Sequence, residues 1–139
     1  MPEDAKTLIR RFYDEVGAGN LGVIDELVAD NFIEHERFPG LEPNKEGIKQ
    51  FFSMLHSAFP DLRIEVHQML ADDDLASARV TVTGTHEGEF MGLQPGGRRI
   101  DVQIFDMLRI SDGQVTEHWG VVDAMTMLRQ LGAIPEVPA

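Results

Sequence analysis

Apolar residues in the first part of the chain recur every three or four positions, which predicts amphipathic helices. The first helix is expected to end at Gly17, and a second, shorter one to follow Asn20 and end near Asp30. A third is expected between the cap residue Asn44 and Pro60. The apolar faces are, in order, Ala5, Leu8, Ile9, Phe12, Tyr13 and Val16; Ile24, Leu27 and Val28, continued by Phe32; and Ile48, Phe51, Phe52 and Leu55.

From Leu62 onward apolar and polar residues alternate, which predicts β-strands. The first strand begins at Leu62, the second follows a turn at residues 72–74, the third ends in a hairpin at residues 111–113, and the last spans residues 115–122. A short helix is expected after Asp123. The inner faces of the second and third strands are predicted to be Ala76, Ala78, Val80, Val82, Gly84 and His86, and Ile100, Val102, Ile104, Asp106, Leu108 and Ile110.

Helices followed by a run of strands is the order of an α+β domain, because a parallel sheet would need alternating crossover helices. Long, twisted strands then curl over the helices. We therefore expect a curved antiparallel sheet that forms a cone-shaped half barrel closed by the N-terminal helices, with a cavity on its concave face. The chain has 139 residues and contains neither repeats nor linkers, so residues 1–139 are expected to form one domain.

Composition removes several classes of function. A net charge of −12 disfavours nucleic acids and anionic membrane surfaces as partners, because binding them requires clustered Lys and Arg. The chain has no cysteine, so a disulfide framework or a thiolate nucleophile is excluded. No apolar run approaches the roughly 20 residues of a membrane span. The N-terminal residues resemble no signal peptide, which favours a cytoplasmic location.

Asp106 interrupts an otherwise apolar strand face, so its carboxylate needs a partner or an altered pKa. A three-residue hairpin loop would place Asp106 directly opposite His118, within reach of a hydrogen bond. A two-residue loop would place Asp106 opposite Trp119 and turn His118 outward. The sequence leaves both registers open. Asp106 and His118 are thus either an acid-base pair or a structural pair.

Other polar residues have simpler interpretations. His86 ends an apolar strand face and can reach the mouth of the cavity, and His35 follows the second helical region on an undetermined side. Asp123 is expected to cap the C-terminal helix. His56 and His67 are expected to be solvated. The histidines lack the short spacing typical of metal ligands, so no metal is expected.

Three stretches of the chain resemble the SnoaL-like polyketide cyclases, which belong to the NTF2-like superfamily. The stretches are FFSMLHSAFPDLR at residues 51–63, GTHEGEFMGLQPGGRR at residues 84–99, and the segment that contains ISDGQVTEHWGVVDAMTMLRQL at residues 109–131. The resemblance implies a small α+β barrel with an apolar pocket, and a homodimer formed through the outer sheet face. The same fold carries several unrelated activities, so it does not decide the chemistry.

The resemblance also implies a site from which this sequence departs. In the cyclases an Asp on the last strand acts as acid and base and a His on the preceding strand assists it; these positions correspond to Gly120 and Asp106 here. His118 and His86 match histidines of the cyclases. Either the carboxylate has moved from position 120 to position 106, with His118 as its companion, or the original activity is absent.

The leading prediction is a cofactor-independent enzyme in which Asp106 removes a proton next to a carbonyl group and His118 orients or shares it. The expected substrate is a small apolar molecule, cyclic or aromatic. The alternatives are a non-catalytic ligand-binding domain and a subunit-interaction module that uses outward residues such as Phe105 and Trp119. The residues expected to contact the ligand are His35, His86, Trp119, Phe12, Phe52, Ile104 and Gly120.

Overall fold

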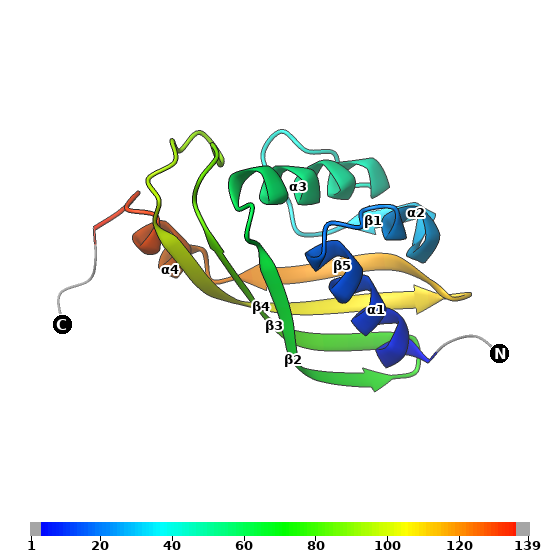
Figure 1. The fold of residues 1–139 in the computed structure, drawn as a ribbon. Helices are drawn as coiled ribbons and strands as arrows, with labels where there is room; N and C mark the ends of the chain where they lie inside the picture. Colours follow the sequence, from blue (N-terminus) through cyan, green and yellow to red (C-terminus); the bar gives the residue numbers. More distant parts are fainter. Residues whose placement is uncertain (1–3, 136–139) are drawn as a thin grey trace.

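The computed structural model describes residues 4–135 as helices packed on one curved, unclosed sheet (Figure 1). The elements in chain order are α1 (Ala5–Gly17), α2 (Val23–Leu27), β1 (Val28–Glu34), α3 (Lys45–Ala58), β2 (Arg63–Asp72), β3 (Leu75–Thr85), β4 (Arg99–Ser111), β5 (Gln114–Val122) and α4 (Ala124–Gln130). Among the residues described, none of the helices is both long and apolar enough to cross a membrane.

The sheet has the strand order β1-β5-β4-β3-β2. Strands β2 to β5 are antiparallel neighbours, as predicted, whereas β1 is parallel to β5 and forms one edge. Figure 1 shows α1 lying across the sheet and α3 near β1 at one end. The α+β class and the curved sheet closed by N-terminal helices are confirmed.

Strand β1 corrects the prediction that three helices precede the sheet. The second helix ends at Leu27, and Val28 and Phe32 lie in the strand. Their apolar spacing of four residues fits a helix, but a register irregularity between Val28 and Ile33 breaks the alternation expected of a strand. The chain therefore reaches the sheet before α3, and this places Glu34 beside β5.

The helix ends follow from side-chain caps. Asp4, Asn44 and Asp123 each accept a hydrogen bond from the backbone N–H three residues ahead, at Thr7, Gly47 and Thr126. The predicted caps at Asn44 and Asp123 are thus confirmed, and hydrogen bonds from Thr126 lower the pKa of Asp123. The caps fix where α3 and α4 begin against the sheet.

Two apolar clusters hold the layers together. The first joins the buried face of α1 to α2, β1 and the middle of the sheet, and the second joins α3 to the far ends of β3 and β4 around Phe59 and Phe90. The inner faces predicted for β3 and β4 are the buried ones, with Ile104 and Ile110 partly buried. Asp106 is only 7% exposed, so a carboxylate does lie in the apolar face of β4.

Candidate acid-base site

The hairpin between β4 and β5 has a two-residue loop. Ser111 pairs with Gln114, and Asp112 and Gly113 between them have φ values of 52° and 76°. Positive φ at both central positions is the requirement of a type I′ turn, which Asp-Gly satisfies. The three-residue loop was therefore the wrong alternative. On its own, this loop would turn His118 to the outer face.

A β-bulge reverses that outcome. Ile110 pairs with Val115 but Arg109 pairs with Glu117, so Thr116 is an extra residue in β5. Beyond the bulge the register advances by one residue, and every later side chain of β5 changes face. His118 consequently points inward.

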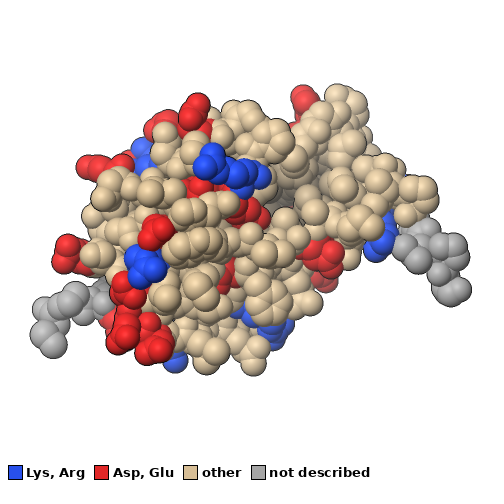
Figure 2. Space-filling model, turned by 180° about the vertical axis from the view of Figure 1, so that it is seen from behind, with Lys and Arg blue, Asp and Glu red and all other residues tan. Residues whose placement is uncertain are grey.

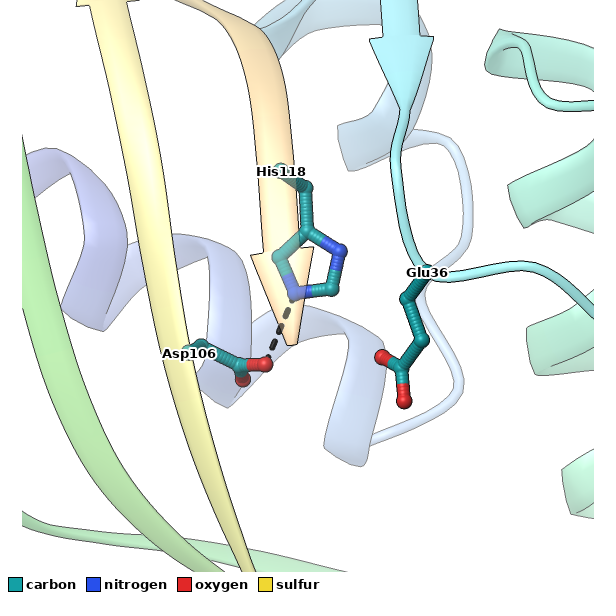
Figure 3. Close-up of side chains that lie close together, drawn as sticks. All are labelled: Glu36, Asp106 and His118. Atoms are coloured by element: carbon teal, nitrogen blue, oxygen red, sulfur yellow. Dashed lines mark hydrogen bonds and ion pairs between the residues drawn. The ribbon is translucent and has the colours of Figure 1, made fainter. Parts of the chain in front are cut away.

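Asp106 and His118 meet diagonally. Asp106 pairs with Gly120, and His118 pairs with Leu108, so the predicted direct opposition of Asp106 and His118 was wrong. They share the inner face, however, and His118 Nε2 lies 2.7 Å from Asp106 Oδ1 (Figure 3). A diagonal pair on one face is within reach of a long side chain.

Two further residues extend this pair into a buried cluster. His118 Nδ1 lies 2.5 Å from Glu34 Oε2, on β1. The hydroxyl group of Tyr13, on α1, donates a hydrogen bond to Asp106 Oδ2. Both nitrogens of His118 and both oxygens of Asp106 thus have partners, contributed by α1, β1, β4 and β5.

The cluster holds His118 as an imidazolium. Burial favours the neutral ring, but hydrogen bonds to Asp106 and Glu34 and the charges of these carboxylates outweigh it and raise the pKa of His118 to about 10. At neutral pH both ring nitrogens are therefore donors. Burial and the nearby charge of Asp106 raise the pKa of Tyr13 well above its ordinary value, so its hydroxyl keeps its proton.

Glu36 brings a third carboxylate to the cluster from the loop after β1. Its side chain extends toward Asp106 and His118 (Figure 3). Burial raises the pKa of Glu36 to about 7, and the carboxylates of Asp106 and Glu34 add to this effect while His118 opposes it. Glu36 therefore changes its charge near neutral pH, which is the property of an efficient general base or acid.

Gly120 makes room for these groups. A Cβ atom at this position would lie 2.4 Å from Glu36 Oε1, 2.6 Å from Asp106 Oδ1 and 2.8 Å from His118 Cε1. Non-bonded atoms do not approach so closely without a shift, so any larger residue would displace the cluster. Gly120 was expected to contact the ligand. Instead, the side chains of Glu36, Asp106 and His118 converge over its backbone.

The same three residues invite a test of metal binding. Glu36, Asp106 and His118 each offer a ligand atom, and these atoms lie within 4.8 Å of one another. Both nitrogens of His118 are engaged by carboxylates, however, so a metal would have to displace one of these hydrogen bonds. The donor set fits a hydrogen-bonded acid-base cluster better than a metal centre.

A cavity of about 130 Å³ lies between the helices and the sheet, and the cluster forms part of its wall. Most of the lining is aliphatic or aromatic, and it includes the predicted contact residues Phe12, Phe52 and Ile104. The polar lining comes from Tyr13, Glu34, Glu36, Asp106 and His118. An apolar cavity with a few convergent polar groups is the usual form of a small-molecule site.

Three predicted contact residues lie elsewhere. His86 is 1% exposed and packs against Phe59, with ring centroids 5.5 Å apart, and it does not line the cavity. His35 and Trp119 stack with centroids 4.7 Å apart on the outer side of the sheet, where His35 also lies 2.9 Å from Glu117. The bulge at Thr116 explains why Trp119 lies on the outer face, because a register that turns His118 inward turns the next residue outward.

The two histidines expected to be solvated differ. His67 is exposed and contacts the hydroxyl of Thr81 at 2.8 Å, as expected of the polar strand face. His56 is partly buried and lies 2.6 Å from the carbonyl oxygen of Val16, so it links α3 to α1. Neither residue belongs to the cluster.

Sequence reasoning missed Tyr13, Glu34 and Glu36 as site residues. A tyrosine on the buried face of the first helix was a signal, because a buried hydroxyl requires a hydrogen-bond partner. Glu34 follows Phe32 by two residues, and this spacing indicates a shared strand face once the segment is read as a strand. Glu36 lies in a loop, where no periodicity reveals its direction.

The fold is that of a small α+β domain with a polar cluster in the wall of an apolar cavity, and comparison with known protein families identifies its class. The family model for SnoaL-like polyketide cyclase matches residues 7–131, and the chain belongs to this family. The recognition made from the sequence is confirmed.

Individual relatives agree with that assignment. The chain is 32% identical to the aklanonic acid methyl ester cyclase DauD of Streptomyces sp. (strain C5) over 133 residues, which cover 90% of this chain and 80% of DauD. It is 28% identical to the cyclase DnrD of Streptomyces peucetius, named for the same substrate, over 90% of this chain and 88% of DnrD. Among solved structures, AclR of Streptomyces galilaeus, provisionally described as a hydroxylase, is 33% identical with a TM-score of 0.83, covering 96% of this chain and 83% of AclR.

Proposed function

We propose that this protein catalyses acid-base chemistry on an apolar, ring-containing molecule, and that the reaction is the aldol closure of a ring in an aromatic polyketide ester. One observation carries the proposal: a buried cluster of one imidazolium and several carboxylates lies in the wall of an otherwise apolar cavity. The names of the cyclase relatives supply the substrate class, an aromatic polyketide methyl ester.

The reaction needs only proton transfers. A base removes a proton from the carbon next to a carbonyl group, and the electron pair of the C–H bond forms an enolate. The enolate carbon then bonds to a second carbonyl carbon, whose oxygen becomes an alkoxide and takes up the proton. The product is an isomer of the substrate, and no electrons are exchanged with a cofactor.

Asp106 and His118 remain at the centre of the proposal. From the sequence we expected Asp106 to be the base, and its position in the cavity wall supports a direct role. Since both of its oxygens already accept hydrogen bonds, from Tyr13 and His118, we assign the acid-base work to the cluster as a whole. The positive charge of His118 favours a developing enolate, because an apolar cavity screens it weakly.

The test is turnover of a panel of aromatic polyketide methyl esters by the wild type and Asp106→Asn. Asp101→Asn, at an exposed position of the same strand, is the matched control. Mass spectrometry and chromatography identify an isomeric ring-closed product, calorimetry measures ligand affinity, and circular dichroism checks folding. We expect ring closure by the wild type and Asp101→Asn, and its loss in a folded, ligand-binding Asp106→Asn.

Two other results would change the assignment. Tight binding of the esters without any conversion would support the alternative of a non-catalytic ligand-binding domain. A product that has gained an oxygen atom would replace ring closure with hydroxylation, the activity provisionally given to AclR.

We further propose that the protein is a homodimer joined through the outer face of the sheet. Phe105, Met107 and Val121 are large apolar residues exposed on this face, with Phe105 56% and Val121 73% exposed. Phe105 pairs with Val121, and Met107 with Trp119, so the apolar side chains are contiguous across β4 and β5. A patch of this kind on a small domain is typical of an interface.

A further inference from the structure

We propose that Glu36 is the general base of this site, and that Gly120 is the residue that admits the Glu36 carboxylate to the cluster. The inference deepens the proposed function and rests on it, because it names the group that removes the substrate proton. Nothing in the sequence pattern indicated Glu36, and its role follows from where the loop after β1 places it.

Position is the first argument. Glu36 lines the cavity, and its carboxylate faces Asp106 and His118 (Figure 3). Its backbone N–H donates to Glu34 Oε2 at 3.2 Å, so the same glutamate that binds His118 also fixes the start of the loop. This backbone hydrogen bond places residue 36 close to Glu34 and His118.

Freedom from hydrogen bonds is the second argument. Within residues 4–135, side chains or backbone groups donate to the carboxylates of Asp106 and Glu34, but no donor is found for that of Glu36. A base must offer an unoccupied lone pair to the proton that it takes. Among the three carboxylates of the cluster, Glu36 meets this condition best.

Charge is the third argument. The groups that face Glu36 are His118 on β5, Asp106 on β4 and Glu34 on β1, with Tyr13 on α1 beyond Asp106. One imidazolium between two carboxylates leaves a net negative neighbourhood, which together with burial raises the pKa of Glu36 to about 7. Near neutral pH Glu36 can therefore accept a proton as the carboxylate and return it as the conjugate acid.

Space is the fourth argument, and it is independent of the charges. Gly120 does not have the positive φ that would require glycine, but a Cβ atom there would lie 2.4 Å from Glu36 Oε1. Glu36 is thus the nearest of the three side chains, with Asp106 and His118, that leave no room for a Cβ atom at position 120. A glycine on the inner face of β5 that leaves room for a carboxylate from a loop indicates a function for that carboxylate.

In the proposed step, Glu36 Oε takes the C–H proton, the C–H electron pair becomes the enolate, and Glu36 becomes neutral. After the new C–C bond forms, Glu36 returns the proton to the alkoxide and is again a carboxylate. His118 keeps its protons throughout, and its charge offsets that of the enolate.

The test measures exchange of the substrate's acidic C–H for deuterium in D₂O by NMR, alongside ring closure, for the ester panel and a protein-free control. The variants are Glu36→Gln, which keeps the shape and removes the base, and Glu89→Gln, the same change at an exposed glutamate outside the cavity lining. We expect both rates to fall by about 10² to 10⁴-fold in Glu36→Gln and to be unchanged in Glu89→Gln. The limb of the wild-type pH profile near 7 should also disappear in Glu36→Gln.

The remaining outcomes separate this inference from the proposed function. Ring closure that persists in Glu36→Gln but is lost in Asp106→Asn would overturn the inference and return the base to Asp106. Deuterium exchange that depends on Glu36, without any ring closure, would support Glu36 as the base and contradict the proposed aldol ring closure. Wild-type exchange no faster than the protein-free rate, with every ester, would overturn Glu36 as a base.

Discussion

Glu34, on β1, is the register partner of His118, on β5, and its Oε2 atom lies 2.5 Å from His118 Nδ1. The parallel edge strand β1 thus supplies the carboxylate that contacts Nδ1 of the imidazole, while Asp106 contacts Nε2. A histidine between two carboxylates is held in one orientation and one charge state. The edge strand β1 is therefore part of the site as well as part of the fold.

Glu34→Gln tests this arrangement. Removing one of the two negative charges should lower the pKa of His118 from about 10 by about 1 to 3, while Asp106 continues to hold the ring. NMR titration of the imidazole resonances measures the change. Glu117→Gln is the control, because Glu117 precedes His118 in β5 but faces Arg109 and His35 on the other side of the sheet. An equal decrease in both variants would contradict a specific role for Glu34.

Glu36 should make the fold less stable as the pH rises. Its folded pKa of about 7 lies above the ordinary value of 4.5, so between these values the folded state binds more protons than the unfolded state. The free energy of unfolding therefore decreases as the pH rises from 4.5 through 7 and changes no further on this account above that range. Relative to the wild type, Glu36→Gln should gain stability over this window.

Urea denaturation of both proteins from pH 4 to pH 9 measures that difference. Other titrating groups are common to the two proteins and cancel in it. Glu89→Gln, an exposed glutamate, should give a difference that is flat over the same range. A flat difference for Glu36→Gln as well would mean that burial does not raise the pKa of Glu36.

The proposed dimer predicts that a charge on the outer sheet face separates the subunits. Phe105→Glu places a carboxylate in the middle of the exposed apolar patch, next to Val121 across the strand pair. Analytical ultracentrifugation should find a dimer for the wild type and a monomer for Phe105→Glu. Met125→Glu, at an exposed apolar residue of α4, should stay dimeric. A monomeric wild type would contradict the proposed homodimer.

Charge distribution is compatible with association through an apolar patch. The chain carries a net charge of −12, and Figure 2 shows acidic side chains spread over several parts of one face, with a few basic ones among them. Two such molecules repel each other at a distance, so apolar contact has to outweigh this repulsion. Added salt screens the charges and should strengthen the dimer.

Much of the fold could be predicted from the sequence because its elements keep a regular period. The apolar face of α1 and the alternation in β3 and β4 each extend over ten or more residues, and both were assigned correctly. β1 was mistaken for the end of a helix because its register irregularity interrupts the alternation. The two-residue period of a strand cannot be recognised in the sequence where a bulge or irregularity in the backbone interrupts it.

The site was predictable only in part for the same reason. Asp106 could be found because it breaks an apolar face, whereas the face of His118 stayed open between two registers. Their diagonal contact depends on a single extra residue, Thr116, which no composition rule places. Glu36 reaches the cluster from a loop, and Gly120, where the resemblance expects an aspartate, leaves the space that Glu36 occupies.

Gly120→Ala tests whether that space is needed, without removing any ionisable group. The added methyl group would overlap Glu36 Oε1 and Asp106 Oδ1, so the carboxylates must shift. We expect a destabilisation of about 1 to 3 kcal/mol, typical of overpacking, and a loss of turnover that exceeds the loss of ligand affinity. Gly96→Ala is the matched control, since nothing lies within 4 Å of a Cβ atom there and its φ is not positive. If Gly120→Ala folds and turns over like Gly96→Ala, the close approach of Glu36 to Gly120 has no part in catalysis.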